Sequence, residues 1–167
     1  MRRFVLGLLA VLLLSVDGAA AQTVTGAQLT WYGIYTVGKT VQEKDSGSVT
    51  GFKNVSSGIS APSTNTDRIS FVDGVRFGFG FELIGTPPNA QVTLKYISKF
   101  PPPGRPDAAT GKLKIAEETS YSGLAINRKD LFIGRVIGDD SLEGTYTMQV
   151  WYIDRLLVEK SFTLEPR

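Results

Sequence analysis

The sequence contains no histidine and no cysteine. Without histidine there is no imidazole to act as a general base, which excludes a Ser-His-Asp triad. Without cysteine there is no thiol nucleophile, no disulfide and no lipid-modified N-terminal cysteine. The two absences together exclude a zinc site built on nitrogen or sulfur ligands. We therefore expect no metal and no cofactor, and a fold that is stabilised by packing alone.

Strong charge and long hydrophobic runs are also lacking. The formal net charge of the 167 residues is +2, which is too small for the electrostatic footprint of a nucleic-acid-binding protein. Beyond the N-terminus no stretch approaches the roughly 20 apolar residues that cross a bilayer. The chain is 42% hydrophobic and 20% charged, a balance typical of one globular domain with its own core.

The N-terminal segment has the order of a secretory signal peptide. Met1–Arg3 is basic, Phe4–Val16 is apolar and Ala19–Ala21 supplies small residues. This order predicts a signal peptide over residues 1–21 that is cleaved at its end, with a single domain over residues 22–167. The alternative is an uncleaved anchor, which N-terminal sequencing of the exported protein would reveal. We expect a periplasmic or secreted protein, most simply bacterial, with no membrane span after cleavage.

Alternating apolar residues predict β-strands along the rest of the chain. The clearest alternation covers residues 75–84, where phenylalanines on one face alternate with glycines on the other. Such a pattern favours a central core strand whose outer face is closely covered. Residues 38–68 are rich in turn formers, with a short hairpin or edge strand expected near residues 49–55. Residues 99–107 are expected to be an extended, polyproline-like connector between sheets, and residues 117–120 a turn or one helical turn.

Further strands are expected over residues 24–37, 68–72, 90–100, 112–116 and 131–137, and in a closing hairpin over residues 142–164. Gly33 within the first of them suggests a bulge or a close backbone approach. Seven to nine short strands without an amphipathic helix predict an all-β fold, an antiparallel sandwich.

The entry to the closing hairpin is typical of immunoglobulin-like domains. Leu142, Gly144 and Tyr146 have the spacing with which such domains begin their penultimate strand. In that setting the tyrosine hydroxyl bonds to the backbone a few residues upstream, forming a tyrosine corner. The fold class that we expect is therefore an immunoglobulin-like antiparallel sandwich, without the cysteine and tryptophan hallmarks of antibody domains.

The chain also resembles a bacterial family of exported proteins of unknown function. The resemblance lies in the segments Trp31–Tyr35 and Phe77–Leu83 and in the hairpin from Gly144 to Phe162. It implies an immunoglobulin-like β-sandwich domain, and no activity comes with it.

Catalysis has few candidates in this sequence. The carboxylates that could serve a hydrolase are Glu117 with Glu118, Asp139 with Asp140, and the isolated Asp67 and Asp73. Neighbouring residues on a strand point to opposite faces, so a doublet does not place two acids on one sugar. No Ser-Lys pair has catalytic spacing and no phosphate-binding loop is present. We expect solvated charge at these positions and a protein that is not an enzyme.

Binding is the remaining class of function. Trp151 shares the polar face of the closing hairpin with threonines and a glutamine, and large aromatics on wet faces often mark contact sites. Trp31 and Tyr35 would extend this patch if their strand belonged to the same sheet. The alternative is that residues 38–68 or the proline-rich connector cover Trp151, in which case it is not a contact site. We expect a non-catalytic module that binds a protein partner, by strand addition at a sheet edge; the alternatives are a carbohydrate-binding module and, less favoured, a carboxylate-based hydrolase.

Overall fold

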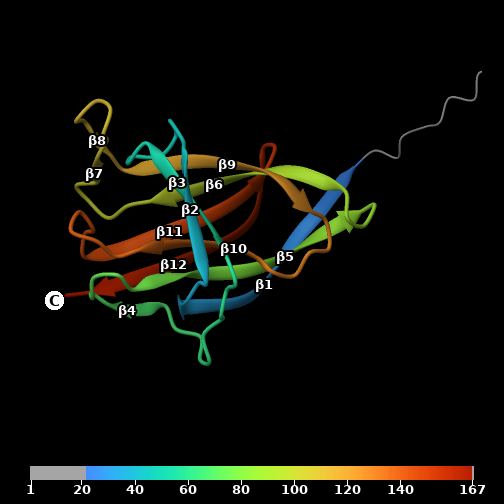
Figure 1. Ribbon diagram of the computed structural model, residues 1–167, viewed down its shortest axis with the longest axis horizontal. Coiled ribbons are helices and arrows are strands. Elements are labelled where there is room, and N and C mark those ends of the chain that lie inside the picture. The colour runs from blue at the N-terminus through green and yellow to red at the C-terminus, as the bar shows by residue number, and fades with distance from the viewer. Residues whose placement is uncertain (1–21, 167) are drawn as a thin grey trace, which may run out of the picture.

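The computed structural model describes residues 22–166, so the expected signal peptide over residues 1–21 lies outside the described residues. Within them the chain consists of strands and loops (Figure 1), and no helix is long and apolar enough to cross a bilayer. The strands are β1 Thr23–Tyr35, β2 Lys39–Lys44, β3 Phe52–Ser57, β4 Arg68–Ser70, β5 Arg76–Thr86, β6 Gln91–Lys99, β7 Arg105–Pro106, β8 Leu113–Lys114, β9 Ala116–Ala125, β10 Leu131–Val136, β11 Gly144–Tyr152 and β12 Arg155–Glu165.

Two sheets form the body of the molecule. One has the order β1-β5-β10 and the other the order β4-β12-β11-β6-β9, which makes eight strands in the two sheets. Two small ribbons, β2-β3 and β7-β8, add four more. Within both sheets all pairs are antiparallel except β4 with β12, which is parallel. The prediction of an all-β, essentially antiparallel sandwich is confirmed.

The core lies between the two sheets. Phe77, Phe79 and Phe81 of β5 are at most 1% exposed, as the alternation predicted. Phe77 meets Tyr146 of β11 and Phe162 of β12 edge-on, with ring centroids 5.7 and 5.5 Å apart. Each buried phenylalanine stabilises the fold by roughly 1.5–3 kcal/mol, so this strand contributes much of the packing that replaces disulfides.

Glycines make the outer face of β5 flat enough for aromatic rings to lie on it. A side chain at Gly80 would overlap the ring of Trp31, and one at Gly134 of β10 would overlap the ring of Tyr35. The two rings are 5.5 Å apart. The expectation that the outer face of β5 is closely covered is therefore confirmed, and the cover comes from β1.

β1 has two register shifts with β5, and neither lies at Gly33, where the sequence suggested a bulge. One is between Val24 and Gly26 and the other between Leu29 and Trp31, while Gly33 stays in regular register. Gly33 instead has a φ of +134° and lies close to the backbone of Thr66, which is the close approach named as the other possibility. Because of the bulge after Leu29, Leu29 and Tyr32 both pack against the core and Trp31 lies outside. Strict alternation would put Leu29 and Trp31 on the same face.

The prediction of a turn or one helical turn at residues 117–120 is wrong. These residues belong to β9, a ten-residue strand that pairs with β6 at the edge of its sheet. Glu117 and Tyr121 point to one face, and Glu118 and Ser120 to the other. The strand escaped prediction because polar residues occupy both faces, which an edge strand tolerates when neither face is fully buried.

The tyrosine corner is present. The backbone N–H of Leu142 donates a hydrogen bond of 2.8 Å to the hydroxyl of Tyr146, which is 2% exposed. This bond fixes the loop before β11 against the core, as the immunoglobulin-like pattern predicted.

Candidate functional site

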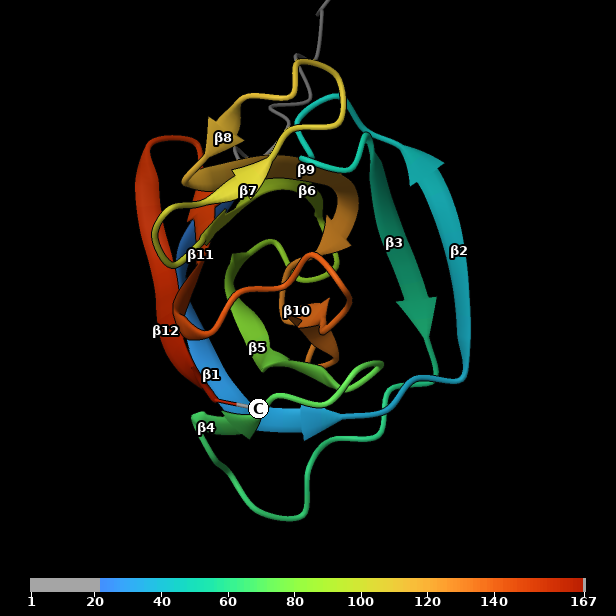
Figure 2. The same ribbon diagram turned by 90° about the vertical axis from the view of Figure 1, so that its left-hand side faces the viewer.

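The open side of the sandwich holds a cavity of about 690 Å³ between the edges of the two sheets. Its walls come from β10 (Leu131–Val136), from inward residues of β9 and from β3 (Phe52–Ser57), which covers it. We call this cavity the groove, and the hairpin β2-β3 the arm. Figure 2 shows the arm as a separate ribbon along one side of the body, opposite β10.

The arm is attached to the body at both ends. At its base, Thr36 and Ser60 exchange backbone hydrogen bonds of 3.2 and 3.0 Å. At its tip, Val49 is buried, and its backbone N–H donates to the carboxylate of Glu117 at 3.0 Å. The Ser48 hydroxyl donates to the same carboxylate at 3.4 Å. The arm therefore spans the groove as a strap fixed at two points.

The edge of β10 that faces away from β5 has unpaired backbone groups. The N–H of Ile137 donates to the carbonyl of Val75 at 2.9 Å, so the backbone N–H of Ile137 points toward the β5 side of β10. In an antiparallel pair, residues alternate between pointing toward the partner and away from it. Phe132, Gly134 and Val136 therefore direct their N–H and C=O groups outward, and β10 has no further strand beside it among residues 22–166.

The underside of the arm has apolar side chains that the body does not bury. The Lys53 ammonium reaches the carbonyl of Ser120 at 3.2 Å and lies 4.7 Å from the ring centroid of Tyr121, so this face of β3 looks toward the body. Val55 shares that face by alternation and pairs with Val41 of β2. The two valines are still 39% and 49% exposed, because the arm stands off from the body instead of packing on it.

Aromatic side chains supply the apolar part of the body's wall. The rings of Tyr96 and Tyr121 are 4.8 Å apart, and those of Tyr35 and Phe132 are 5.7 Å apart. Burial raises the pKa of Tyr35 to about 12 despite the opposing effect of the Arg76 guanidinium. Burial likewise raises the pKa of Tyr121 to about 12. These hydroxyls stay neutral at all physiological pH values.

Ion pairs neutralise most charges of the groove. Arg135 of β10 pairs with Glu117 of β9, and each side chain is 12% exposed, so the pair joins the edges of the two sheets. Arg128 pairs with Asp130. Lys53 lies 3.5 Å from Glu43 of the arm. Arg76 also lines the groove and takes part in none of the ion pairs among residues 22–166.

The three predicted contact residues do not form one patch. Trp31 and Tyr35 lie on the outer face of β1-β5-β10, where Trp31 is partly exposed and Tyr35 is 5% exposed. Trp151 lies in the other sheet, on the outer face of β11. Of the three, only Tyr35 lines the groove.

Trp151 is partly exposed, and its polar atom is already bonded. Its indole N–H donates to Gln149 at 3.0 Å, and the Lys95 ammonium lies 5.7 Å from the ring centroid. The arm covers the groove, and it does not cover this residue. Trp151 is therefore part of a self-contained network on a sheet face rather than of a cavity.

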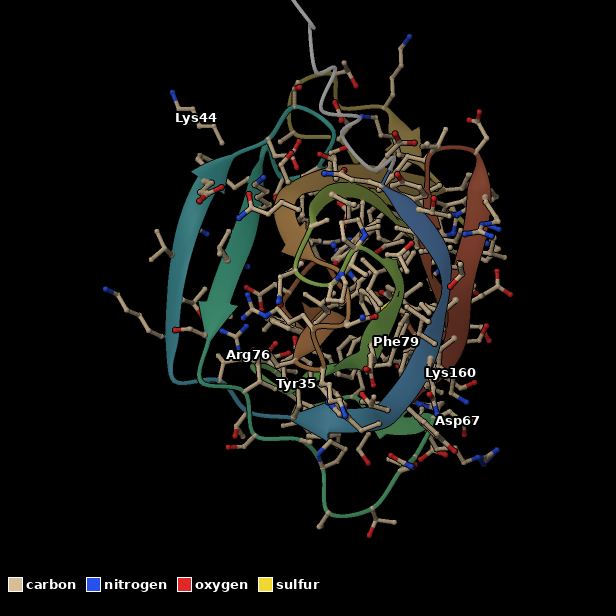
Figure 3. The ribbon with its side chains drawn as sticks, turned by 90° about the vertical axis from the view of Figure 1, so that its right-hand side faces the viewer. Tyr35, Lys44, Asp67, Arg76, Phe79 and Lys160 are labelled. Atoms are coloured by element: carbon tan, nitrogen blue, oxygen red, sulfur yellow. The ribbon has the colours of Figure 1, made fainter. Side chains whose placement is uncertain are left out.

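The acidic candidates are dispersed. Glu117 faces the groove while Glu118 faces outward, 3.7 Å from Lys95, as adjacent residues on a strand must. Asp140 pairs with Arg105, and Asp67 with Lys160 on the opposite side of the sandwich (Figure 3). Within residues 22–166 no three acidic residues gather as a metal site would require.

Sequence reasoning missed the residues that build the groove. Arg76 and Arg135 belong to strands that the sequence predicted. Their positions in the sequence do not indicate which strand lies at an unpaired sheet edge. Glu117 was considered only as half of an acidic doublet. The one local signal was the pair of half-apolar strands around residues 41 and 55 in a segment otherwise rich in turn formers.

No protein-family model matches the sequence, and no curated protein matches it. Among solved structures, the fold is similar to the crystal structure of an immunoglobulin-like protein from Pseudomonas aeruginosa, with a TM-score of 0.57. The two sequences are 17% identical, and the similarity covers 89% of this chain and 99% of the other. The fold of this chain is thus an immunoglobulin-like β-sandwich, as the tyrosine corner and the strand pattern predicted.

Proposed function

We propose that this chain is an exported, non-catalytic interaction module that binds an extended segment of a protein partner in the groove. The segment adds to β10 as a fourth strand of the sheet β1-β5-β10, beneath the arm. Export rests on the signal-like order of residues 1–21. Cell fractionation with N-terminal sequencing of the exported protein tests it, and an intact residue 1 in the exported form would contradict cleavage.

One observation carries the proposal: β10 ends its sheet with an unpaired edge, and this strand lines the groove together with β3 of the arm. Natural proteins usually cover, charge or shorten exposed strand edges, because such edges pair with other chains. Here the six residues of β10, roughly 20 Å of strand at about 3.3 Å per residue, have an unpaired edge beneath the arm. A bound strand would receive backbone hydrogen bonds from β10 and apolar contact from Val55, which lines the groove.

Catalysis by paired carboxylates has no support in the groove. Glu117 and Asp130 are the acids that line it, and each is held by an arginine. The hydrogen bond from Arg128 lowers the pKa of Asp130, which makes this carboxyl a poor proton donor. Glu117 bridges Arg135 and the tip of the arm, so its oxygens are engaged within the fold.

The proposal is tested by removing one outward N–H of β10. Proline at Val136 deletes a donor that points into the groove and leaves the bonds to β5 intact, which edge strands tolerate. The matched control is Thr163→Pro in β12, where proline disrupts an interior strand and should lower stability instead. Melting temperature and circular dichroism establish that Val136→Pro retains the fold.

Partners captured from a periplasmic extract by the wild-type chain should be lost by Val136→Pro. Hydrogen exchange of the complex gives the specific readout. The amides of Phe132, Gly134 and Val136 should exchange rapidly in the free protein and slowly in the complex. Capture of a partner that leaves these three amides unprotected would contradict strand addition.

Carbohydrate binding, the second candidate, rests on Trp151 alone, because Trp31 and Tyr35 lie in the other sheet. A glycan titration followed by tryptophan fluorescence separates the two functions. The proposed function predicts no change in the emission of the wild-type chain, whereas a glycan site at Trp151 predicts a shift that Trp151→Phe abolishes.

A further inference from the structure

We propose that the segment bound in the groove carries an acidic side chain and that Arg76 binds its carboxylate. This inference rests on the proposed function and adds to it the chemistry of the partner: an extended peptide with aspartate or glutamate at one fixed position. It follows from the position of Arg76, from the flat sheet face beside it and from the charge that the groove leaves unneutralised.

Arg76 lies at the start of β5, directly between its partners in the two neighbouring strands. Tyr35 of β1 pairs with it on one side and Val136 of β10 on the other. Figure 3 shows Arg76 and Tyr35 next to each other, between the end of β1 and the arm. Val136 is one of the residues whose backbone groups point outward, so Arg76 lies level with the last of the docking positions on β10.

The Tyr35 side chain shows how far a group on this sheet face reaches toward the free edge. The Tyr35 side chain starts on β1, and its hydroxyl lies where a side chain of Gly134 on β10 would be. It therefore reaches across β5 to the edge strand. The Arg76 guanidinium is close enough to this hydroxyl to oppose the effect of burial on it. A strand added to β10 lies two strand spacings, roughly 10 Å, from β5, a gap that arginine and glutamate side chains span together.

The charge of the groove favours an anion at this point. Glu117, Asp130 and Glu43 already pair with Arg135, Arg128 and Lys53. Arg76 is left without a carboxylate among residues 22–166, and it is only partly exposed, between an aromatic ring and the arm. A partly desolvated guanidinium gains most from a ligand that supplies charge and two acceptor oxygens in one plane.

The probe is a phage-displayed library of random linear peptides, selected on the wild-type chain and on Arg76→Gln. The matched control is Lys44→Gln, which removes an exposed cation at the far end of the arm (Figure 3). Peptides selected on the wild type and on Lys44→Gln should share an aspartate or glutamate at one position. Peptides selected on Arg76→Gln should lack it.

A double-mutant cycle on the strongest synthetic peptide then measures the contact. Arg76→Gln, and replacement of the peptide's acidic residue by its amide, should each weaken binding about tenfold or more. The second change should have no further effect once the first is made. If Arg76→Gln lowered stability, the peptide change alone, measured on the wild type, still decides.

The possible failures are distinct. Peptides that protect the amides of Gly134 and Val136 but show no acidic preference would overturn the role of Arg76 and leave the proposed function standing. Full additivity in the cycle would do the same. If no peptide protected these amides, the proposed function itself would be overturned, and this inference with it.

Discussion

At the scale of single residues, the structure shows where one polar atom holds a loop in place. Tyr146 combines a buried ring, in contact with Phe77 and Phe100, with one hydroxyl that accepts a bond from the N–H of Leu142. The ring and the hydroxyl contribute separately, because phenylalanine retains every ring contact and removes only the acceptor.

We expect Tyr146→Phe to lower the free energy of unfolding by about 1–2 kcal/mol, since the N–H of Leu142 loses its partner in a part-buried position. Tyr152→Phe is the control, on the same strand and half-buried, and should cost less than about 0.5 kcal/mol. Urea denaturation of both variants measures the difference. Equal stability of the two variants would show that the corner bond contributes nothing.

At the scale of elements, the arm is one of two ribbons outside the main sheets, and it is attached to the body at both of its ends. Its stability as an isolated two-stranded ribbon would be marginal in water, so its position depends on what holds its ends. The carboxylate of Glu117 is central, because it accepts from the arm's tip and pairs with Arg135 at the same time.

We expect Glu117→Gln to cost about 3 kcal/mol, because it leaves the Arg135 charge without its partner in a mostly buried place. Amides of residues 45–51 should exchange faster, as the tip loses an acceptor. Glu118→Gln is the matched control: this neighbour points outward to Lys95, and an exposed pair of this kind contributes below about 1 kcal/mol. Unchanged exchange at the tip in Glu117→Gln would contradict the role of this carboxylate as the arm's anchor.

At the scale of the whole molecule, stability in acid depends on a carboxyl that the fold holds ionised. Asp107 follows β7, and its side chain is 4% exposed. Lys114 of β8, at 2.5 Å, and the hydroxyl and N–H of Thr110, at 2.8 and 2.9 Å, lower the pKa of Asp107 to about 2. The unfolded chain has a pKa near 3.9 at this residue.

A depressed folded pKa adds stability that is complete above the unfolded pKa and is lost as the pH falls through the folded one. We therefore expect the contribution of Asp107 to be full above about pH 5 and to disappear between about pH 4 and pH 2. Asp107→Asn should lower the melting temperature at pH 7 and flatten its decline in that acid window. Asp154→Asn, in the exposed turn before β12, should leave the curve unchanged; a wild-type decline in Asp107→Asn would refute the assignment.

Much of the sandwich could be predicted because its signals are local. The alternation of Phe77, Phe79 and Phe81 with glycine requires only that a strand has a period of two. The corner at Tyr146 likewise depends on residues within four positions of one another. The predictions that failed also have physical reasons. The bulge after Leu29 inverts the faces of the residues that follow it, so β1 does not alternate regularly. β9 has polar residues on both faces, so it shows no alternation of apolar and polar residues.

The sequence by itself determined that the protein lacks thiol and imidazole chemistry, that its strands alternate, and that its core is built from phenylalanine between glycines. These properties depend on composition and on neighbours along the chain. Only the tertiary structure decided which strand edges remain open, that the arm crosses the space between β9 and β10, and that Arg76 and Tyr35 meet there. Sheet order is set by packing between residues far apart in sequence, and no local pattern contains it.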